Sequence, residues 1–176
     1  MSYIRNLYKT DYRAFIKLPV RRQNVTEKYS NFTQRATLKD YLKEDFYHRC
    51  IYCGWSSSKY GGEVFHIEHI KSQDSHPELK DNYDNLALSC SICNTSKGNK
   101  EFPDELNPIS EKFQSLFYRN KMGAIVVNNL LNQSDKKLSN QCLNIIGLYK
   151  ELYKLDYIYE SLSLIKDKLC LTRESS

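Results

Sequence analysis

The stretch Phe65-His66-Ile67-Glu68-His69-Ile70 decides the fold, because it places an acid beside a histidine within an apolar run. Two of the four histidines of the chain lie in it. The Ser, Lys and Gly residues between Trp55 and Gly62 predict a turn, and the apolar run after them indicates a buried strand from Glu63 to Ile70. We therefore expect most of the chemistry of this chain around that strand.

Two cysteine pairs frame the strand, with Cys50-x-x-Cys53 before it and Cys90-x-x-Cys93 after it. In such a knuckle both thiolates can face one cation, and two knuckles supply the four tetrahedral sulfur ligands that structural zinc takes. A reducing compartment favours metal ligation over disulfides. Residues 54 to 89 form a longer insert than the roughly 15–20 residues of a simple zinc ribbon, so a folded segment must fill it.

Local signals predict the elements around the strand. Thr37, with an acid three residues on, is typical of a helix N-cap, and apolar residues follow it at helical spacing. The polar residues 71 to 84 predict a loop. Leu86 to Ser89 is short enough for a second strand, and Cys90 to Lys97 suits a short helix that Gly98 ends.

Length and charge restrict the class of protein. At 176 residues the chain has the length of one domain, or of one domain with a small appendage. The net charge is +5, but residues 1 to 43 hold ten Lys and Arg against three acids, so this part carries +7 and the remainder −2. A membrane-spanning apolar run and a signal-peptide pattern are both missing. We therefore expect a soluble, cytoplasmic protein without a membrane partner.

The basic N-terminal part has two interpretations. Between residues 20 and 35, cations alternate with rings: Arg21, Arg22, Lys28 and Arg35 with Tyr29 and Phe32. Cations for phosphates and rings for base stacking favour a nucleic-acid-binding arm. A charge run is also commonly a solvated loop. The first 16 residues, before Leu18-Pro19, predict a short helix.

The last part of the chain changes character. Residues 113 to 119 and 123 to 127 predict a β-hairpin, and Ser134-Asp135 predicts the start of a helix that Gly147 ends. A second helix, from Tyr149 to Leu169, carries an apolar face. This face packs on the core of the chain or docks a partner subunit, and packing on the core is favoured.

Strand, long loop, strand and helix, with a histidine on the strand and an asparagine on the helix, resemble the HNH endonucleases and their ββα-metal site. That family carries an Asp-His or Glu-His pair, a central Asn and a final His or Asn. In this chain Glu68-His69, Asn85 and Asn94 stand at these positions, between the cysteine pairs.

The resemblance implies an α+β fold. Its ββα-metal core with structural zinc would occupy residues 46–102. An N-terminal basic and helical segment, residues 1–45, would precede the core. A C-terminal hairpin and helices, residues 103–176, would follow it.

The resemblance also implies a role for each side chain. His69 would be the general base that activates water, and Glu68 and Asn94 would hold one divalent cation against the scissile phosphate. Asn85 would fix the loop that carries His69. Hard oxygen donors suit Mg²⁺ or Mn²⁺, and a neutral imidazole is a suitable proton acceptor near pH 7.

Two further residues have alternative roles. His66 shares the Glu68 face under strand alternation, and is either an additional cation ligand or a structural histidine. Lys97 follows Asn94 on the same helical face, and either contacts a substrate phosphate or is a solvated surface lysine. Alternation would also separate Glu68 from His69, so we expect the strand to end or bend at His69.

The segment that includes Ser75-x-Pro77-Glu78-Leu79, Asn82-Tyr83-Asp84-Asn85-Leu86 and Cys93-Asn94-x-x-Lys97-Gly98 is similar to one HNH subgroup. This subgroup comprises the small nucleases of bacterial Septu and retron-type phage-defence systems, which act beside a companion ATPase. The similarity implies a metal-dependent endonuclease that hydrolyses phosphodiester bonds of nucleic acid, with DNA favoured. The competing hypothesis is an inactive, zinc-stabilised adaptor that binds nucleic acid or protein.

Overall fold

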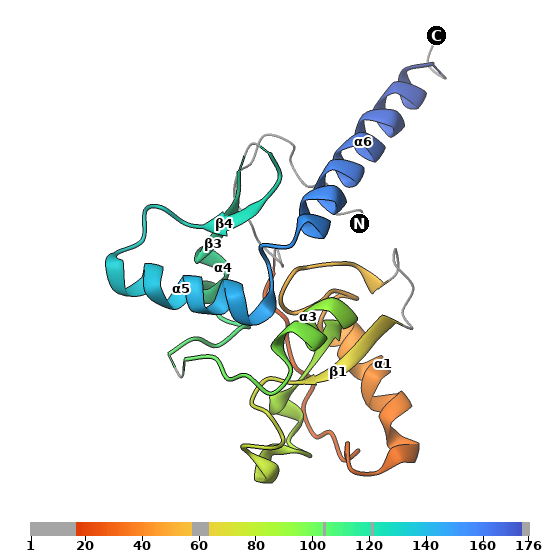
Figure 1. The fold of residues 1–176 in the computed structure, drawn as a ribbon. Coiled ribbons are helices and arrows are strands. Elements are labelled where there is room, and N and C mark those ends of the chain that lie inside the picture. Colours follow the sequence, from red (N-terminus) through yellow and green to blue (C-terminus); the bar gives the residue numbers. More distant parts are fainter. Residues whose placement is uncertain (1–16, 58–63, 104, 121, 174–176) are drawn as a thin grey trace.

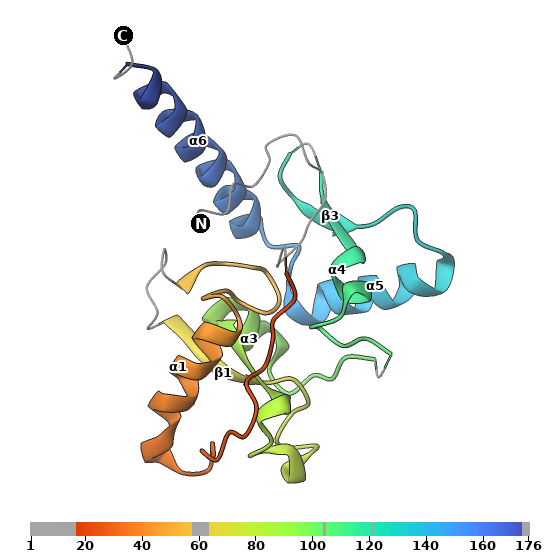
Figure 2. The same cartoon turned by 180° about the vertical axis from the view of Figure 1, so that it is seen from behind.

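The computed structural model describes residues 17–57, 64–103, 105–120 and 122–173 (Figure 1). The helix predicted within the first 16 residues lies outside these ranges, and so does most of the turn predicted before Gly62. In both views the C-terminal helix extends away from the rest of the molecule (Figures 1 and 2).

A two-stranded antiparallel sheet and a helix form the centre of the candidate site. Strand β1 (Phe65–His69) pairs with β2 (Leu86–Cys90), so that Phe65 lies opposite Cys90 and His69 opposite Leu86. Helix α3 (Ser91–Lys97) follows β2 directly. Gly98 ends the helix with a φ of +50°, which favours glycine. The two strands and the helix predicted here are all present, with slightly different ends.

Strand β1 does not keep a strict alternation of exposed and buried side chains. His66 is exposed, whereas the neighbours Glu68 and His69 are both buried. The strand ends at His69, as expected, and the next residue, Ile70, donates its backbone N–H to the Asn85 carbonyl. Leaving the sheet at this point lets the acid and the histidine face the same region.

Helix α1 (Arg35–Asp45) packs on this sheet, and its start differs from the sequence prediction. A 3₁₀ turn, η1 (Phe32–Gln34), precedes it, and the Asn31 side chain caps that turn by accepting from the Thr33 backbone N–H. Thr37 therefore lies inside the helix and is not its N-cap, because the helix continues from an earlier turn. Leu38 and Leu42, on the apolar face of α1, are fully buried.

The loop between the strands contains two 3₁₀ turns, η3 (Pro77–Leu79) and η4 (Tyr83–Asn85). The Asn82 side chain caps the second turn by accepting from the Asp84 backbone N–H. These turns bring the end of the loop back to the start of β2.

Downstream, the predicted hairpin is present but shorter than expected. Helix α4 (Glu111–Ser115) occupies the first part of the predicted strand, because Ser110 caps a helical turn by accepting from the Phe113 N–H. Strand β3 (Phe117–Arg119) then pairs antiparallel with β4 (Ile125–Val127). The hairpin is thus confirmed, with its first strand limited to three residues.

Helix α5 (Gln133–Ile146) starts slightly earlier than predicted. Asn132, not Ser134-Asp135, is its N-cap, since the Asn132 side chain accepts from the Asp135 backbone N–H. Gly147 ends the helix at a φ of +72°, as its position predicts.

Helix α6 (Glu151–Arg173) packs on the core only at its beginning. Tyr153 and Asp156 are buried, but farther along the helix large apolar side chains are 41–64 % exposed. They are Leu155, Ile158, Tyr159, Leu162, Ile165 and Leu169. The favoured prediction of core packing is wrong for this stretch, because the helix extends beyond the other described elements (Figure 1).

One cluster of buried apolar side chains draws on all three predicted segments of the chain. It includes Leu42 of α1, Tyr52 beside the first cysteine pair, Phe113 of α4, Ile146 of α5 and Tyr153 of α6. The core therefore continues across the boundaries predicted between the three segments, at residues 45 and 102. Within the described ranges, no helix, α6 included, combines the length and apolarity that crossing a membrane requires.

Candidate active site and metal centre

The four cysteines of the two pairs converge on one point. The sulfur atoms of Cys50, Cys53, Cys90 and Cys93 all lie within 4.8 Å of one another, and all four residues are buried. Cys90 ends β2 and Cys93 lies in α3, while the first pair sits in a turn where the Gly54 N–H donates to the Cys50 carbonyl. This arrangement fits the tetrahedral sulfur set of a structural zinc ion.

Crowding and burial shape the charge of this cluster. Burial raises the pKa of the Cys53 and Cys93 thiols well above its usual value. Burial also opposes ionisation of Cys50, but hydrogen bonds from the other three thiols outweigh it and hold the pKa of Cys50 well below its usual value. Four thiolates packed this closely would repel one another, so the set needs a bound cation to neutralise them.

The acid, the histidine and the helix asparagine face one cavity of about 210 Å³. Glu68 and His69 come from the end of β1, and Asn94 comes from α3. The remaining lining residues are Tyr29, Ile67, Ser72, Gln73, Gly98 and Asn99. Residues far apart in the sequence thus present one imidazole, one carboxylate and one amide to the same space.

The orientation of His69 is fixed by a backbone carbonyl. Its Nε2 lies 3.0 Å from the carbonyl oxygen of Lys80, and a carbonyl only accepts, so Nε2 carries the proton. A neutral ring then has its lone pair on Nδ1. The Tyr29 ring packs edge-on against the imidazole at 4.6 Å between centroids. Burial lowers the pKa of His69, which favours the neutral form.

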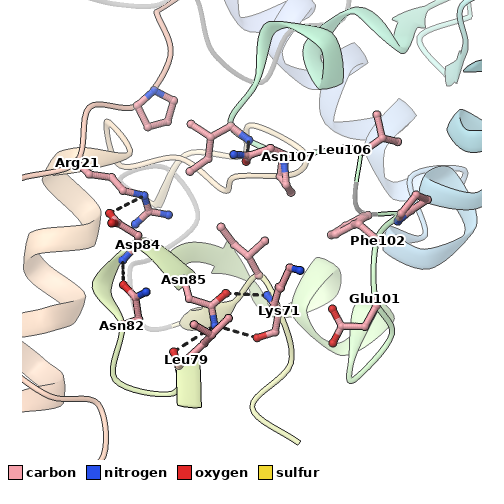
Figure 3. A pocket seen from close by; sticks show the side chains of 15 residues that line it. Arg21, Lys71, Leu79, Asn82, Asp84, Asn85, Glu101, Phe102, Leu106 and Asn107 are labelled. Carbon is pink, nitrogen blue, oxygen red and sulfur yellow. Dashed lines mark hydrogen bonds and ion pairs between the residues drawn. The ribbon is translucent and has the colours of Figure 1, made fainter. Parts of the chain in front are cut away.

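Asn85 ties together the two ends of the loop that carries Lys80. Its Oδ1 accepts from the Lys71 N–H at 2.9 Å, and its Nδ2 donates to the carbonyls of Lys71 and Leu79 at 2.9 and 3.3 Å (Figure 3). The Asn85 side chain is buried, and these three hydrogen bonds satisfy its own polar atoms away from water. Asn85 thereby positions the loop. It is not among the described residues that line the cavity of Glu68, His69 and Asn94.

Glu68 has an internal cationic partner that the sequence did not reveal. The Lys97 ammonium lies 2.9 Å from Glu68 Oε1, and the Tyr52 hydroxyl donates to the same oxygen at 3.1 Å. Lys97 is only 1 % exposed, so it is neither a solvated lysine nor placed at the surface for a phosphate. Burial raises the pKa of Glu68, while Lys97 and Tyr52 act in the opposite direction.

The cavity retains oxygen donors for a divalent cation. The contacts of Glu68 with Lys97 and Tyr52 both fall on Oε1, which leaves Oε2 as the oxygen available to the cavity. The amide oxygen of Asn94 belongs to a side chain that lines the same cavity. One carboxylate oxygen and one amide oxygen, with water in the other positions, fit the coordination that Mg²⁺ prefers.

His66 is separated from this group of residues. It pairs with Ser89 across the sheet, its side chain is exposed, and it is not among the described residues that line the cavity. The sequence left His66 as either a cation ligand or a structural histidine, and this geometry does not favour the ligand role.

Two basic residues of the N-terminal part, Arg21 and Arg22, bind groups inside the molecule. Arg21 donates to the carbonyls of Tyr83 and Leu86 at 2.7 and 2.6 Å. Arg22 pairs with Glu44 and Asp45 at 2.6 and 3.1 Å. These two arginines therefore fasten the segment to α1 and to the start of β2, and neither the free arm nor the solvated loop describes them. No local sequence signal distinguishes such arginines from phosphate-binding ones.

A larger cavity of about 550 Å³ lies beside the Asn85 hydrogen bonds (Figure 3). Its lining includes the charged residues Arg21, Lys71 and Asp84 and the apolar residues Phe102 and Leu106. Among the described residues that line it, Glu68, His69 and Asn94 are missing, so these three candidates belong to the smaller cavity, whereas Asn85 lines the larger one.

The comparison with known families supports the same region. Residues 50–100 match the family described as HNH endonuclease. The match begins at the first cysteine of the four-cysteine cluster and includes β1, β2 and α3, with all the lining residues of the smaller cavity except Tyr29. It covers less than a third of the chain. A search of curated proteins gave no match.

Proposed function

We propose that this protein is a metal-dependent endonuclease that hydrolyses phosphodiester bonds of nucleic acid, with DNA the favoured substrate. One observation carries the proposal: His69, Glu68 and Asn94 line a single cavity within the region that matches the HNH endonuclease family. The hydrogen bond from His69 Nε2 to a carbonyl adds support, because it directs the basic Nδ1 away from that carbonyl.

In this proposal each residue has a defined task. His69 Nδ1 accepts a proton from water as the water oxygen attacks phosphorus and the bond to the leaving oxygen breaks. Glu68 Oε2 and Asn94 would hold Mg²⁺ or Mn²⁺, which when bound neutralises charge on the leaving oxygen. Asn85 keeps the loop in place, so that the Lys80 carbonyl holds the imidazole in the required tautomer.

Replacing His69 tests this proposal. We expect His69→Ala to lose cleavage of plasmid DNA by roughly a hundredfold to ten-thousandfold with Mg²⁺ or Mn²⁺ present, because a general base contributes about that much. The variant should keep its zinc, its melting temperature within a few degrees, and its nucleic-acid binding. His76→Ala is the matched control, since His76 pairs with Glu78 outside the cavity.

Parental cleavage by a folded His69→Ala variant would contradict the role of His69. An unfolded or zinc-free variant would show that His69 is structural, and would favour the inactive adaptor. The Glu68–Lys97 ion pair is the observation that favours the inactive-adaptor hypothesis, because Lys97 already neutralises the acid without a divalent cation.

We further propose that the nuclease acts in the cytoplasm within a bacterial phage-defence system, beside a companion ATPase. The motif resemblance to Septu and retron-type nucleases motivates this assignment. The exposed apolar side chains of α6 support a protein partner of some kind, since large contiguous apolar surfaces commonly mark interaction sites.

A further inference from the structure

Lys97 is the most deeply buried cation of the candidate site. A lysine is rarely this buried unless it is paired, and here the ammonium has three acceptors for its three donors. They are Glu68 Oε1 at 2.9 Å, the His69 carbonyl at 3.0 Å and the Gly98 carbonyl at 3.5 Å. The ammonium therefore connects α3 to the end of β1, where the acid and the base meet.

The ammonium shares its carboxylate with the cavity. Lys97 and Tyr52 contact Oε1, and Oε2 of the same group is the oxygen left to bind a divalent cation. A fixed positive charge beside one carboxylate oxygen weakens the negative potential at the other oxygen, and it also repels a second cation nearby. The geometry thus makes Lys97 a competitor for the charge of Glu68, although it is not itself a ligand.

We infer that Lys97 is a built-in counter-cation that keeps the affinity of the free protein for divalent cations low. The cation would then bind firmly only when a substrate phosphate adds the negative charge that Lys97 has offset. Lys97 is accordingly a positioning residue: it holds Glu68 and the end of β1, and it couples cation binding to nucleic-acid binding. This inference rests on the proposed nuclease site but concerns its cation affinity alone.

Titration of the full-length, zinc-loaded protein with Mn²⁺, followed by electron paramagnetic resonance without nucleic acid, tests the inference. Lys97→Met keeps the length of the side chain and removes its charge, so Glu68 regains its full attraction for a cation. We expect Mn²⁺ to bind at least roughly tenfold more tightly than to the parent protein. Lys100→Met is the control, because this substitution changes the net charge by the same amount. Lys100 is exposed, and its ammonium donates to the Ser96 carbonyl.

A second readout covers the case in which Lys97→Met is unstable. If a divalent cation can replace the ammonium beside Glu68, Mn²⁺ should raise the melting temperature of Lys97→Met more than that of the parent or of Lys100→Met. Mn²⁺ binding no tighter than in the parent, with no extra thermal gain, would overturn the inference. Neither readout uses cleavage, so a parent that binds Mn²⁺ but never cuts nucleic acid refutes only the proposed function.

Discussion

At the scale of single residues, hydrogen bonds to backbone groups determine the site more than the identity of its side chains does. His69 acquires its tautomer from the Lys80 carbonyl, and that carbonyl is placed by a loop that Asn85 closes. Lys80 and Leu79 take part in these hydrogen bonds through their backbone carbonyls. A residue such as Asn85 can therefore matter for activity without facing the substrate.

Replacing Asn85 should reveal this dependence. Asn85→Ala removes the three hydrogen bonds of the buried Asn85 side chain to the backbone of Lys71 and Leu79, so we expect a loss of about 2–3 kcal/mol in the free energy of unfolding, measured in urea. Asn82→Ala is the control, because exposed Asn82 only caps a short turn and its loss should cost about 1 kcal/mol. Equal losses in the two variants would mean that Asn85 does not hold the loop.

At the scale of elements, the cysteine cluster joins the turn after α1 to the junction of β2 and α3. The backbone supports the same junction, since the Ile51 N–H donates to the Leu88 carbonyl at 2.8 Å. Tyr153 adds α6 to this region through a contact of 3.1 Å between its hydroxyl and Cys93 Sγ. A metal at this point would thus hold together elements that are distant in the sequence.

Removal of one sulfur ligand should therefore disrupt folding and not merely activity. Structural zinc contributes about 10–16 kcal/mol of apparent binding free energy, which matches or exceeds the usual stability of a domain of about 5–15 kcal/mol. We expect elemental analysis to find one zinc per untagged chain, and Cys50→Ser to be insoluble or unfolded. Cys142→Ser, at a buried cysteine outside the cluster, should retain zinc. Zinc-free parent protein would refute the assignment.

At the scale of the whole molecule, α6 joins the core only through its beginning. Its beginning is anchored by Tyr153, whose carbonyl accepts from Arg119 and whose ring lies 5.8 Å from that of Trp55. Beyond this anchor, six large apolar side chains are 41–64 % exposed: Leu155, Ile158, Tyr159, Leu162, Ile165 and Leu169. Burying such side chains stabilises by about 1.5–3 kcal/mol each, so a partner helix or groove would gain substantially by covering them.

Charged substitutions on this face test for a protein partner. If the companion ATPase proposed above binds this face, Leu155→Asp with Leu162→Asp should abolish the association, as measured by chromatography with light scattering. The melting temperature should stay near that of the parent, because both side chains are more than half exposed. Lys166→Asp, at an exposed polar position of the same helix, serves as the control. A parent that remains monomeric and never associates with that protein would count against a docking role.

Much of the fold was predictable because its signals are local. The C-x-x-C pairs, the short strands around Glu68-His69 and Leu86, and the glycines that end α3 and α5 act over a few residues and depend little on the rest of the chain. Helix starts were less predictable. Thr37 has a suitable cap pattern, but the 3₁₀ turn at Asn31 lies upstream and begins the helix first.

The sequence by itself determined which residues are the candidates for the site: four thiols, an acid beside a histidine, and two asparagines. Only the tertiary structure decided how they are used, because contacts between residues such as Glu68 and Lys97 depend on how strand and helix pack. A lysine near a helix end looks the same in sequence whether it is solvated or buried. Packing alone placed Lys97 out of water, where its charge requires a partner, and Glu68 is the acid within reach.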